Sequence, residues 1–365
     1  TRGDSATLDL PTADLHLVND DDLTFAAARP DADSLQVMLD RAGTNLETAN
    51  LRSARATDYY TLKGGGREVW EPRFTFHGFR YIETWWNGPG EYGKVEALEG
   101  VVLHADMPRT GHFECSHPLL NQLYRNTVWG QKGNFLEVPT DCPQRDERLG
   151  WTGDAQVFCR AAAFNMDVSG FFRKWLKDFR DTQTAEGAIP ATIPYTESFG
   201  PMPDGGPAWA DAGVICPWTI YLCYGDKEIL AKNYGVMTRF MDFLLATSPG
   251  YIRCAPDYQG WLGFGDWLSI NADTPRDLIG TAFLAYDANL MAQIAAVLGK
   301  TRDAARYRKL FADVKKAFAA RFLVGARRSE AEIQAAIDRT QVAEADAISR
   351  GNLKTVEYGP VESKV

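Results

Sequence analysis

The chain has 365 residues, of which 45% are hydrophobic and 24% are charged. This length and composition allow a large buried core and two domains, and they exclude a disordered protein and a small disulfide-stabilised scaffold. The 39 Lys and Arg residues against 48 Asp and Glu residues give a net charge of −9. No broad positive surface is expected for a phosphate backbone, so we expect no nucleic-acid partner.

The sequence shows no membrane segment and no export signal. It has no stretch of about 18 uninterrupted apolar residues, and it begins Thr-Arg-Gly-Asp without a basic-then-apolar leader. We therefore expect no membrane partner. A start inside polar sequence predicts that the chain is part of a longer product, so the native compartment stays open, and the oligomeric state is left open to a homodimer.

Residues 1–108 are predicted to form a β-sandwich domain, followed by a linker at 109–116. Stretches with alternating apolar residues are bounded by turn residues, including the triple glycine at 64–66. Trp85 and Trp86 are expected in a loop, where they would form either a sugar platform or a contact with a neighbouring domain. The candidate strands span 58–63, 68–84 and 95–104.

From Ser116 onward the apolar spacing becomes helical, with Ser116 as the expected helix cap. Long connections rich in Gly, Pro and aromatic residues alternate with very short ones, which predicts helical hairpins whose long loops build a site at one end. We predict an (α/α)6 barrel, or toroid, over 117–365, incomplete after residue 322. The helices are expected at 117–130, 154–166, 168–182, 207–224, 227–247, 277–299 and 302–322, with a further charged helix or insertion at 327–350.

The cysteines and histidines limit the chemistry. The six cysteines form no CxxC pair and are interpreted as reduced core residues. All five histidines precede residue 118, which excludes a Ser-His-Asp triad or a His-ligated metal built wholly from residues after it. Chemistry there must come mainly from carboxylates. Trp129, Trp175 and Trp218 have apolar helical spacing and are expected in the core.

Carboxylates, arginines and a tryptophan are concentrated between residues 138 and 154. One interpretation is structural, with ion pairs to the two arginines and Asp154 as a helix cap. The other is catalytic: close carboxylates raise one another's pKa, so one stays protonated as a general acid while the others bind hydroxyls. Carboxylates with aromatic residues are typical of glycoside cleavage. The charged members are Asp141, Arg145, Asp146, Glu147, Arg148 and Asp154.

The sequence Asp141-Cys142-Pro143-Gln144-Arg145-Asp146-Glu147-Arg148-Leu149-Gly150-Trp151-Thr152-Gly153-Asp154 resembles the bacterial α-L-rhamnosidases of glycoside hydrolase family seventy-eight. Phe76-His77-Gly78-Phe79-Arg80-Tyr81 adds to the resemblance, as do the shorter stretches Trp209-Ala210-Asp211-Ala212 and Gly265-Asp266-Trp267-Leu268. The resemblance covers about residues 58–322, which predicts a fragment truncated at both ends.

The resemblance implies an inverting hydrolase that releases terminal α-L-rhamnose from a rhamnose-containing glycoside and needs no cofactor and no metal. By motif, Glu147 matches the general acid. The general base of the family is a late Glu beside a Trp, and since this chain has no Trp after Trp267, no base is assigned. The implied substrate-binding residues are Asp141, Arg145, Asp146, Asp154 and Asp266, with Trp151, Trp209 and Trp267 as an aromatic wall for the 6-deoxy methyl group.

Two alternatives stay open. The chain could be a rhamnoside-binding fragment without catalysis, in which the same carboxylates and tryptophans hold the sugar. It could also be another α/α-toroid enzyme, either a different glycosidase or a polysaccharide lyase. Asp211 has two interpretations as well, as a sugar ligand or as an acidic residue that stabilises a helix N-terminus.

Overall fold

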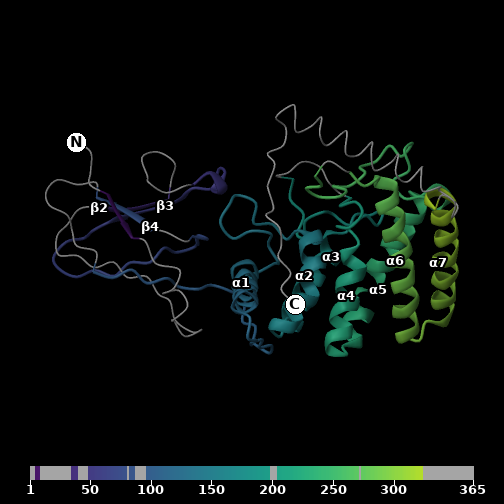
Figure 1. Cartoon of the computed structure of the whole chain (residues 1–365), viewed down its shortest axis with the longest axis horizontal. Coiled ribbons are helices and arrows are strands. Elements are labelled where there is room, and N and C mark those ends of the chain that lie inside the picture. The colour runs from purple at the N-terminus through teal and green to yellow at the C-terminus, as the bar shows by residue number, and fades with distance from the viewer. Residues whose placement is uncertain are drawn as a thin grey trace, which may run out of the picture.

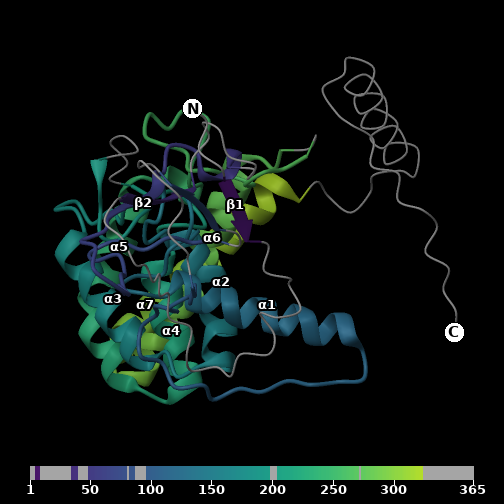
Figure 2. The same ribbon diagram turned by 90° about the vertical axis from the view of Figure 1, so that its left-hand side faces the viewer.

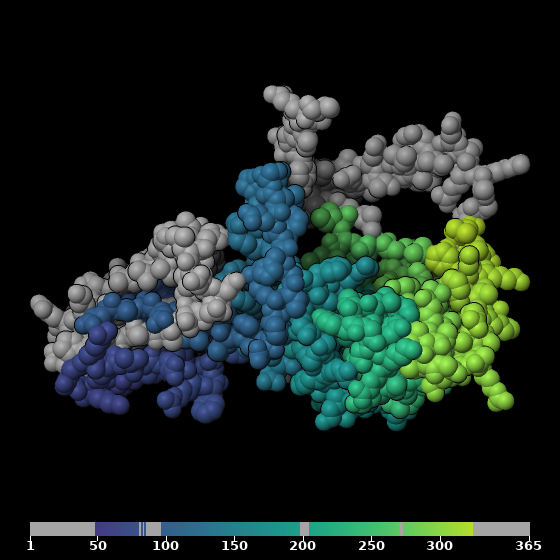
Figure 3. Space-filling view, turned by 90° about the horizontal axis from the view of Figure 1, so that it is seen from below, coloured from purple at the N-terminus to yellow at the C-terminus, as the bar shows by residue number. Residues whose placement is uncertain are grey.

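The computed structural model describes residues 5–8, 34–39, 48–79, 82–86, 96–197, 204–270 and 273–323. A β domain and a helical domain follow one another along the chain, and they lie at opposite ends of the molecule in Figure 1. In the space-filling view of Figure 3, blue atoms of the region around α1 (Pro118–Asn134) stand between the purple N-terminal part and the teal-to-yellow helices.

The β domain contains one antiparallel sheet of four described strands, in the order β1-β4-β2-β3. In the central pair, Leu35 of β2 lies opposite Trp86 of β4, and on its other edge β2 pairs with β3 from Ser34↔Thr61 to Leu39↔Ala56. Ala56 and Ile82 are buried. The strands are β1 (Ser5–Leu8), β2 (Ser34–Leu39), β3 (Ala56–Thr61) and β4 (Ile82–Trp86).

The strand predicted over 58–63 corresponds to β3, and the one predicted over 68–84 is confirmed only at its end, where residues 82–84 belong to β4. Residues 68–79 and 96–104, all of them described, form no strand, so the prediction over 95–104 is wrong for these residues. Phe74 is fully exposed, whereas the ring of Phe76 lies against the Arg148 guanidinium. Phe76 therefore contacts the helical domain instead of forming one face of a sheet. Trp85 and Trp86 belong to β4 and not to a loop. The remainder of that expected loop lies outside the described residues.

The helical domain follows the predicted order, with helices at each of the expected places up to residue 322. The predicted cap Ser116 is wrong, because His117 precedes the first helical residue and the Asn121 side chain bonds both backbone groups of Cys115. The predicted segment 327–350 lies outside the described residues. After α1 come α2 (Thr152–Asn165), α3 (Ser169–Thr182), α4 (Ala212–Tyr224), α5 (Lys227–Ala246), α6 (Arg276–Val297) and α7 (Thr301–Phe322).

Alternate helices pack against one another. α2 contacts α4 and α4 contacts α6, while α3 contacts α5. α4 and α6 are apolar on nearly all sides, as expected of helices covered by neighbours, whereas α3 is strongly amphipathic and turns Phe172, Trp175 and Phe179 inward. α1 extends away from the other helices in Figure 2, and its buried residues lie in its second half.

The tryptophans expected in the core are only partly confirmed. Trp175 is fully buried, and its indole Nε1 donates to the Ile193 carbonyl at 2.8 Å. Trp218 is half-buried against the core. The prediction for Trp129 is wrong: it is 37% exposed and lies beneath the Lys132 ammonium. Among the cysteines, Cys142, Cys159, Cys216 and Cys254 are buried and Cys223 is exposed.

The long loops lie at one end of the helical array because successive helices reverse direction. α2–α3, α4–α5 and α6–α7 are joined by two or three residues each. Loops 135–151, 183–211 and 247–275 follow α1, α3 and α5 and therefore emerge at the same end. No helix in the described part of the chain is long and apolar enough to cross a membrane.

Candidate active site

The segment 139–150, here called the acid loop, connects α1 to α2 and is held against the β domain. Arg148 donates to the Phe76 carbonyl at 3.0 Å. A Cβ atom on Gly78 would lie 2.8 Å from the Pro143 carbonyl carbon, so the two segments are in direct backbone contact. The Ser53 hydroxyl donates to the Asp146 carboxylate. The acid loop is thus folded between two domains.

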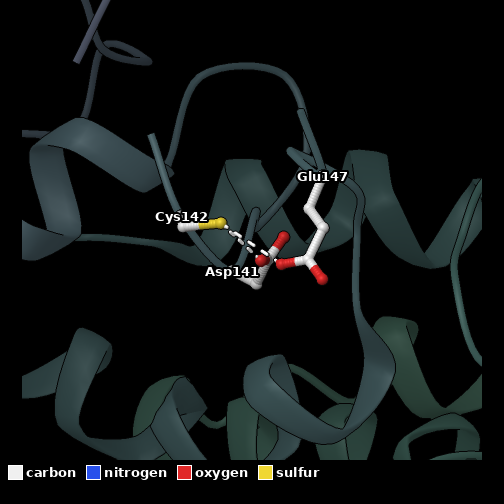
Figure 4. A group of neighbouring side chains, drawn as sticks. All are labelled: Asp141, Cys142 and Glu147. Atoms are coloured by element: carbon white, nitrogen blue, oxygen red, sulfur yellow. Dashed lines mark hydrogen bonds between the residues drawn. The ribbon is translucent and has the colours of Figure 1, made fainter. Parts of the chain in front are cut away.

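Glu147 lies within this loop with both carboxylate oxygens bound by arginines. Arg145 Nη2 is 2.6 Å from Oε2, and Arg52 Nη1 is 2.7 Å from Oε1. Arg145 also lies 3.5 Å from Asp141 Oδ2. In Figure 4 the side chains of Asp141, Cys142 and Glu147 point toward one another, with the Cys142 thiol bonded to Asp141 at 2.6 Å. The structure therefore brings Asp141, Arg145 and Glu147 together.

The two carboxyl groups of this cluster have opposite pKa shifts. Burial and the hydrogen bond with Glu147 raise the pKa of Asp141. Burial also acts to raise the pKa of Glu147, but the hydrogen bond with Asp141 and the cations Arg52 and Arg145 outweigh it and lower this pKa. In this arrangement the proton shared by the pair is favoured on Asp141, and Glu147 is favoured as the carboxylate.

Asp154 and Asp146 have different surroundings. Asp154 lies in the first turn of α2, where its side chain is accessible, and its pKa is raised by partial desolvation and by the negative charge of Glu147. α2 begins at Thr152, so Asp154 follows the cap position instead of occupying it. Asp146 is exposed, and its hydrogen bond with Ser53 lowers its pKa. Asp146 is therefore bonded to the β domain, whereas Asp154 lies near the Glu147 carboxylate.

Ligand atoms of Asp141, Cys142 and Glu147 lie within 4.8 Å of one another, close enough to share a cation. Burial and the neighbouring Asp141 raise the pKa of the Cys142 thiol to about 12, which disfavours the thiolate that a metal would need. Arg52 and Arg145 already supply positive charge to Glu147. The donor set fits hydrogen bonding to hydroxyl groups better than metal coordination.

An aromatic cluster forms where the three long loops meet. It consists of Trp151, Trp209, Trp261, Phe264 and Trp267, with Phe264 in the centre. The Phe264 ring centroid lies 5.6 Å from that of Trp151, 4.7 Å from that of Trp209 and 5.5 Å from that of Trp267. Trp267 is 62% exposed. The three predicted tryptophans are therefore neighbours, although they are far apart in sequence.

Backbone contacts between the loops fix this cluster. Thr152 N donates to Ala191 O at 2.9 Å, and Ile193 N donates to Gly150 O at 2.8 Å. A Cβ atom on Gly206 would lie 2.4 Å from the Cα atom of Gly263, a close approach that requires glycine at both positions. These contacts link the acid loop to loop 183–211, and that loop to loop 247–275.

Two buried charged residues, Asp211 and Arg253, hold the turn that carries Trp209 in place. α4 begins at Ala212 and not at residue 207 as predicted, because residues 207–211 form a turn with positive φ at Ala208. Asp211 is fully buried, accepts from Ala208 N at 2.5 Å and pairs with Arg253 at 2.6 Å. Asp211 is therefore a structural residue and not a sugar ligand.

The predicted site residue Asp266 is exposed and accepts a hydrogen bond from the Thr274 hydroxyl at 2.9 Å. Other members of the site were not predicted from the sequence. Phe264 and Trp261 were missed, although Trp261, Phe264 and Trp267 recur every three residues in a glycine-rich loop. Arg52 was missed as well, and no local pattern links it to Glu147, which is 95 residues away.

Comparisons with known proteins agree with this architecture. Residues 108–354 match the bacterial alpha-L-rhamnosidase 6 hairpin glycosidase domain, and residues 34–104 match the bacterial alpha-L-rhamnosidase concanavalin-like domain. The chain is 46% identical to an alpha-L-rhamnosidase of Streptomyces avermitilis over 79% of its length, and 43% identical to one of Formosa agariphila over 77%. These matches span only 27% and 30% of the two relatives.

Solved structures show the same relationship. The crystal structure of Streptomyces avermitilis alpha-L-rhamnosidase complexed with L-rhamnose superposes with a TM-score of 0.74 at 40% identity, covering 90% of this chain and 33% of that one. The alpha-L-rhamnosidase from Dictyoglumus thermophilum gives a TM-score of 0.72 at 35% identity, covering 84% of this chain and 36% of that one. The helical domain and the N-terminal concanavalin-like domain therefore place this chain in the bacterial α-L-rhamnosidase family, glycoside hydrolase family seventy-eight.

Proposed function

We propose that the chain carries the acid side of an α-L-rhamnosidase site, which binds a terminal α-L-rhamnosyl group and protonates the bond to its leaving group. The observation that carries this proposal is the juxtaposition of Asp141, Arg145 and Glu147 in one loop that ends at Trp151 of the aromatic cluster. A polar side that grips hydroxyls and an apolar side that receives a methyl group match the two faces of rhamnose.

In the proposed reaction Glu147, in its protonated form, donates its proton to the glycosidic oxygen as the bond to the anomeric carbon breaks. A water molecule, deprotonated by a base outside the residues assigned here, adds to the opposite face of the ring and inverts the anomeric centre. Asp141, Arg145 and Asp154 hold the sugar hydroxyls. Asp146, bonded to Ser53, and Asp266, bonded to Thr274, contribute to binding from the edges of the site.

The aromatic cluster is the proposed determinant of sugar specificity. A hydroxyl group on C6 would lose hydrogen bonds to water when buried against largely apolar rings, whereas the methyl group of rhamnose gains dispersion contacts. Trp267 is the exposed member of the cluster and is therefore available to contact a ligand. Trp209 and Trp151 lie behind it around Phe264.

The packing also supports the proposed architecture. Alternating contacts of α2 with α4 and of α4 with α6 are expected of an inner helical layer, and α3 with α5 of an outer layer. We infer the first part of an (α/α)6 toroid over 117–365, a linker at 109–116 and a β-sandwich over 1–108.

The test is hydrolysis of 4-nitrophenyl α-L-rhamnoside by this chain, with proton NMR to identify the anomer released first. We expect β-L-rhamnose, and Glu147→Gln should lower turnover about 10²- to 10⁴-fold, as removal of a general acid does, while L-rhamnose binding is retained. Saturable rhamnose binding without hydrolysis in the parent chain would show that no base acts from within these residues, as the rhamnoside-binding alternative requires. A chain that does not bind L-rhamnose and does not hydrolyse the rhamnoside would contradict both the proposed function and the rhamnoside-binding alternative.

A further inference from the structure

Arg52 belongs to the β domain, yet it touches the proposed catalytic acid. It follows the short 3-10 helix Ala49–Leu51 and adopts a φ of 56°, a conformation that glycine or asparagine adopts more readily than arginine. Its guanidinium lies 2.7 Å from Glu147 Oε1, and the next residue, Ser53, bonds Asp146. Unlike glycine or asparagine, an arginine at this unfavourable backbone position has a side chain long enough to reach Glu147.

The two guanidinium groups on Glu147 differ in how firmly they are held. Arg145 lies in the acid loop itself, where its Nε donates to the Cys142 sulfur at 2.8 Å and its Nη2 lies near Asp141. The Arg52 side chain is 48% exposed, against 32% for that of Arg145. Arg52 is thus the more easily displaced of the two partners, and it covers oxygen Oε1.

A general acid must present a protonated oxygen to the leaving group, and both oxygens of Glu147 are occupied here. A guanidinium group on each oxygen favours the carboxylate over the protonated acid, so Glu147 becomes a better proton donor once one of these partners moves away. We propose that Arg52 is a positioning residue of the acid: it holds Oε1 while the site is empty, yields that oxygen to the glycosidic oxygen of a bound rhamnoside, and returns to stabilise the carboxylate after the proton has left.

The proton that reaches the glycosidic oxygen comes from the Asp141–Glu147 pair. Displacement of Arg52 removes a positive charge from Glu147, so the proton shared with Asp141 moves to Glu147, which then donates it to the glycosidic oxygen as the C–O bond breaks. The charged and titratable groups around Glu147 are Arg52 from the β domain, Asp141, Cys142, Arg145 and Asp146 from the acid loop, and Asp154 from α2. Arg52 is the one cation among them that comes from the β domain.

The inference rests on the proposed function for its chemistry, but the contact can be tested without turnover. The ¹³C signal of the Glu147 carboxyl group, assigned by its loss in Glu147→Gln, is followed against pH in the full chain. We expect Arg52→Gln to move its titration to higher pH, because a cation that favours the carboxylate is gone, and Arg52→Lys to move it less. Arg67→Gln removes another cation of the β domain, 3.5 Å from Glu96, and should leave the curve unchanged.

Binding of free L-rhamnose separates this proposal from the proposed function. Arg52→Gln should bind L-rhamnose within about twofold of the parent, because free rhamnose carries no leaving group, and this would show that the site is folded. An unchanged Glu147 titration in an Arg52→Gln chain that still binds rhamnose would overturn the role of Arg52. If the Glu147 titration moves to higher pH in Arg52→Gln but the parent chain does not bind L-rhamnose, the role of Arg52 is supported and the proposed function is contradicted.

Discussion

At the scale of single residues, Glu147 shows how its neighbours set the charge of a carboxyl group. Burial acts to raise the pKa of Glu147, yet the hydrogen bond with Asp141 and the two guanidinium groups outweigh it and lower this pKa. In the proposed function, the resting site holds hydroxyl groups, and proton donation follows once a bound rhamnoside has changed the surroundings of Glu147. Phe264, in contrast, has no polar group and acts only through its ring contacts.

Phe264→Ala should loosen the aromatic cluster, because this ring is the shared neighbour of the Trp151, Trp209 and Trp267 rings. We expect a loss of about 2–3 kcal/mol in the free energy of unfolding by urea, below the roughly 3–5 kcal/mol of a fully buried Phe→Ala change because Phe264 is only partly buried, and weaker L-rhamnose binding. Phe264→Leu keeps most of the volume and should lose less of both. Unchanged rhamnose affinity in the alanine variant would show that the cluster does not line the sugar site.

At the scale of elements, the start of α2 is shaped to accept Trp209. A Cβ atom on Gly153 would lie 2.7 Å from the Trp209 indole, so the ring rests directly on the backbone of the first helical turn. The Gln156 side chain also donates to the Ala208 carbonyl at 3.1 Å. The helix that carries Asp154 thus fixes one tryptophan of the aromatic cluster in position.

Gly153→Ala should push the Trp209 ring away, at a cost of about 1–3 kcal/mol in unfolding free energy and with reduced affinity for L-rhamnose. Gly130→Ala in α1 is the matched control, because no atom lies within 4 Å of its added Cβ. That change should stabilise the chain by about 0.5–1 kcal/mol through helix propensity. Equal effects of the two substitutions in urea unfolding would contradict the packing described for Trp209.

Much of this organisation could be predicted from sequence because it is local. The 3.6-residue spacing located the helices, and the contiguous motif from Asp141 to Asp154 placed most of the polar site in one loop. Contacts between distant segments could not be predicted, because no local signal records them: Arg52 reaches Glu147 across two domains. The strand predicted over 68–84 forms only at residues 82–84, since an alternating pattern such as Phe74 and Phe76 does not distinguish a sheet face from a domain contact.

At the scale of the whole molecule, a buried group of charges joins the loops to the helical core. Arg253, in loop 247–275, pairs with Asp211 at the start of α4 and faces Asp287 in α6, and all three are buried. Among the described residues neither carboxylate oxygen of Asp287 has a hydrogen-bond partner. Burial and the nearby Asp211 raise the pKa of Asp287 well above its ordinary value.

A raised pKa in the folded state means that folding favours protonated Asp287, so its contribution to stability is lost as pH rises from the unfolded value toward the folded one. Asp287→Asn cannot ionise. It should therefore be more stable than the parent by about 1 kcal/mol or more at pH 8, and the difference should shrink as pH falls toward 4. Urea unfolding at several pH values checks this, and a constant difference across that range would contradict the assignment.

The central claim is that the acid loop and the aromatic cluster form one site for a 6-deoxy sugar, and the most direct test compares binding of L-rhamnose and L-mannose by isothermal titration calorimetry. The two sugars differ only in the C6 hydroxyl of L-mannose. We predict that the chain binds L-rhamnose about 10- to 100-fold more tightly, because that hydroxyl would lose its hydrogen bonds against the aromatic rings. Equal affinity for the two sugars, or binding of neither, would contradict the account.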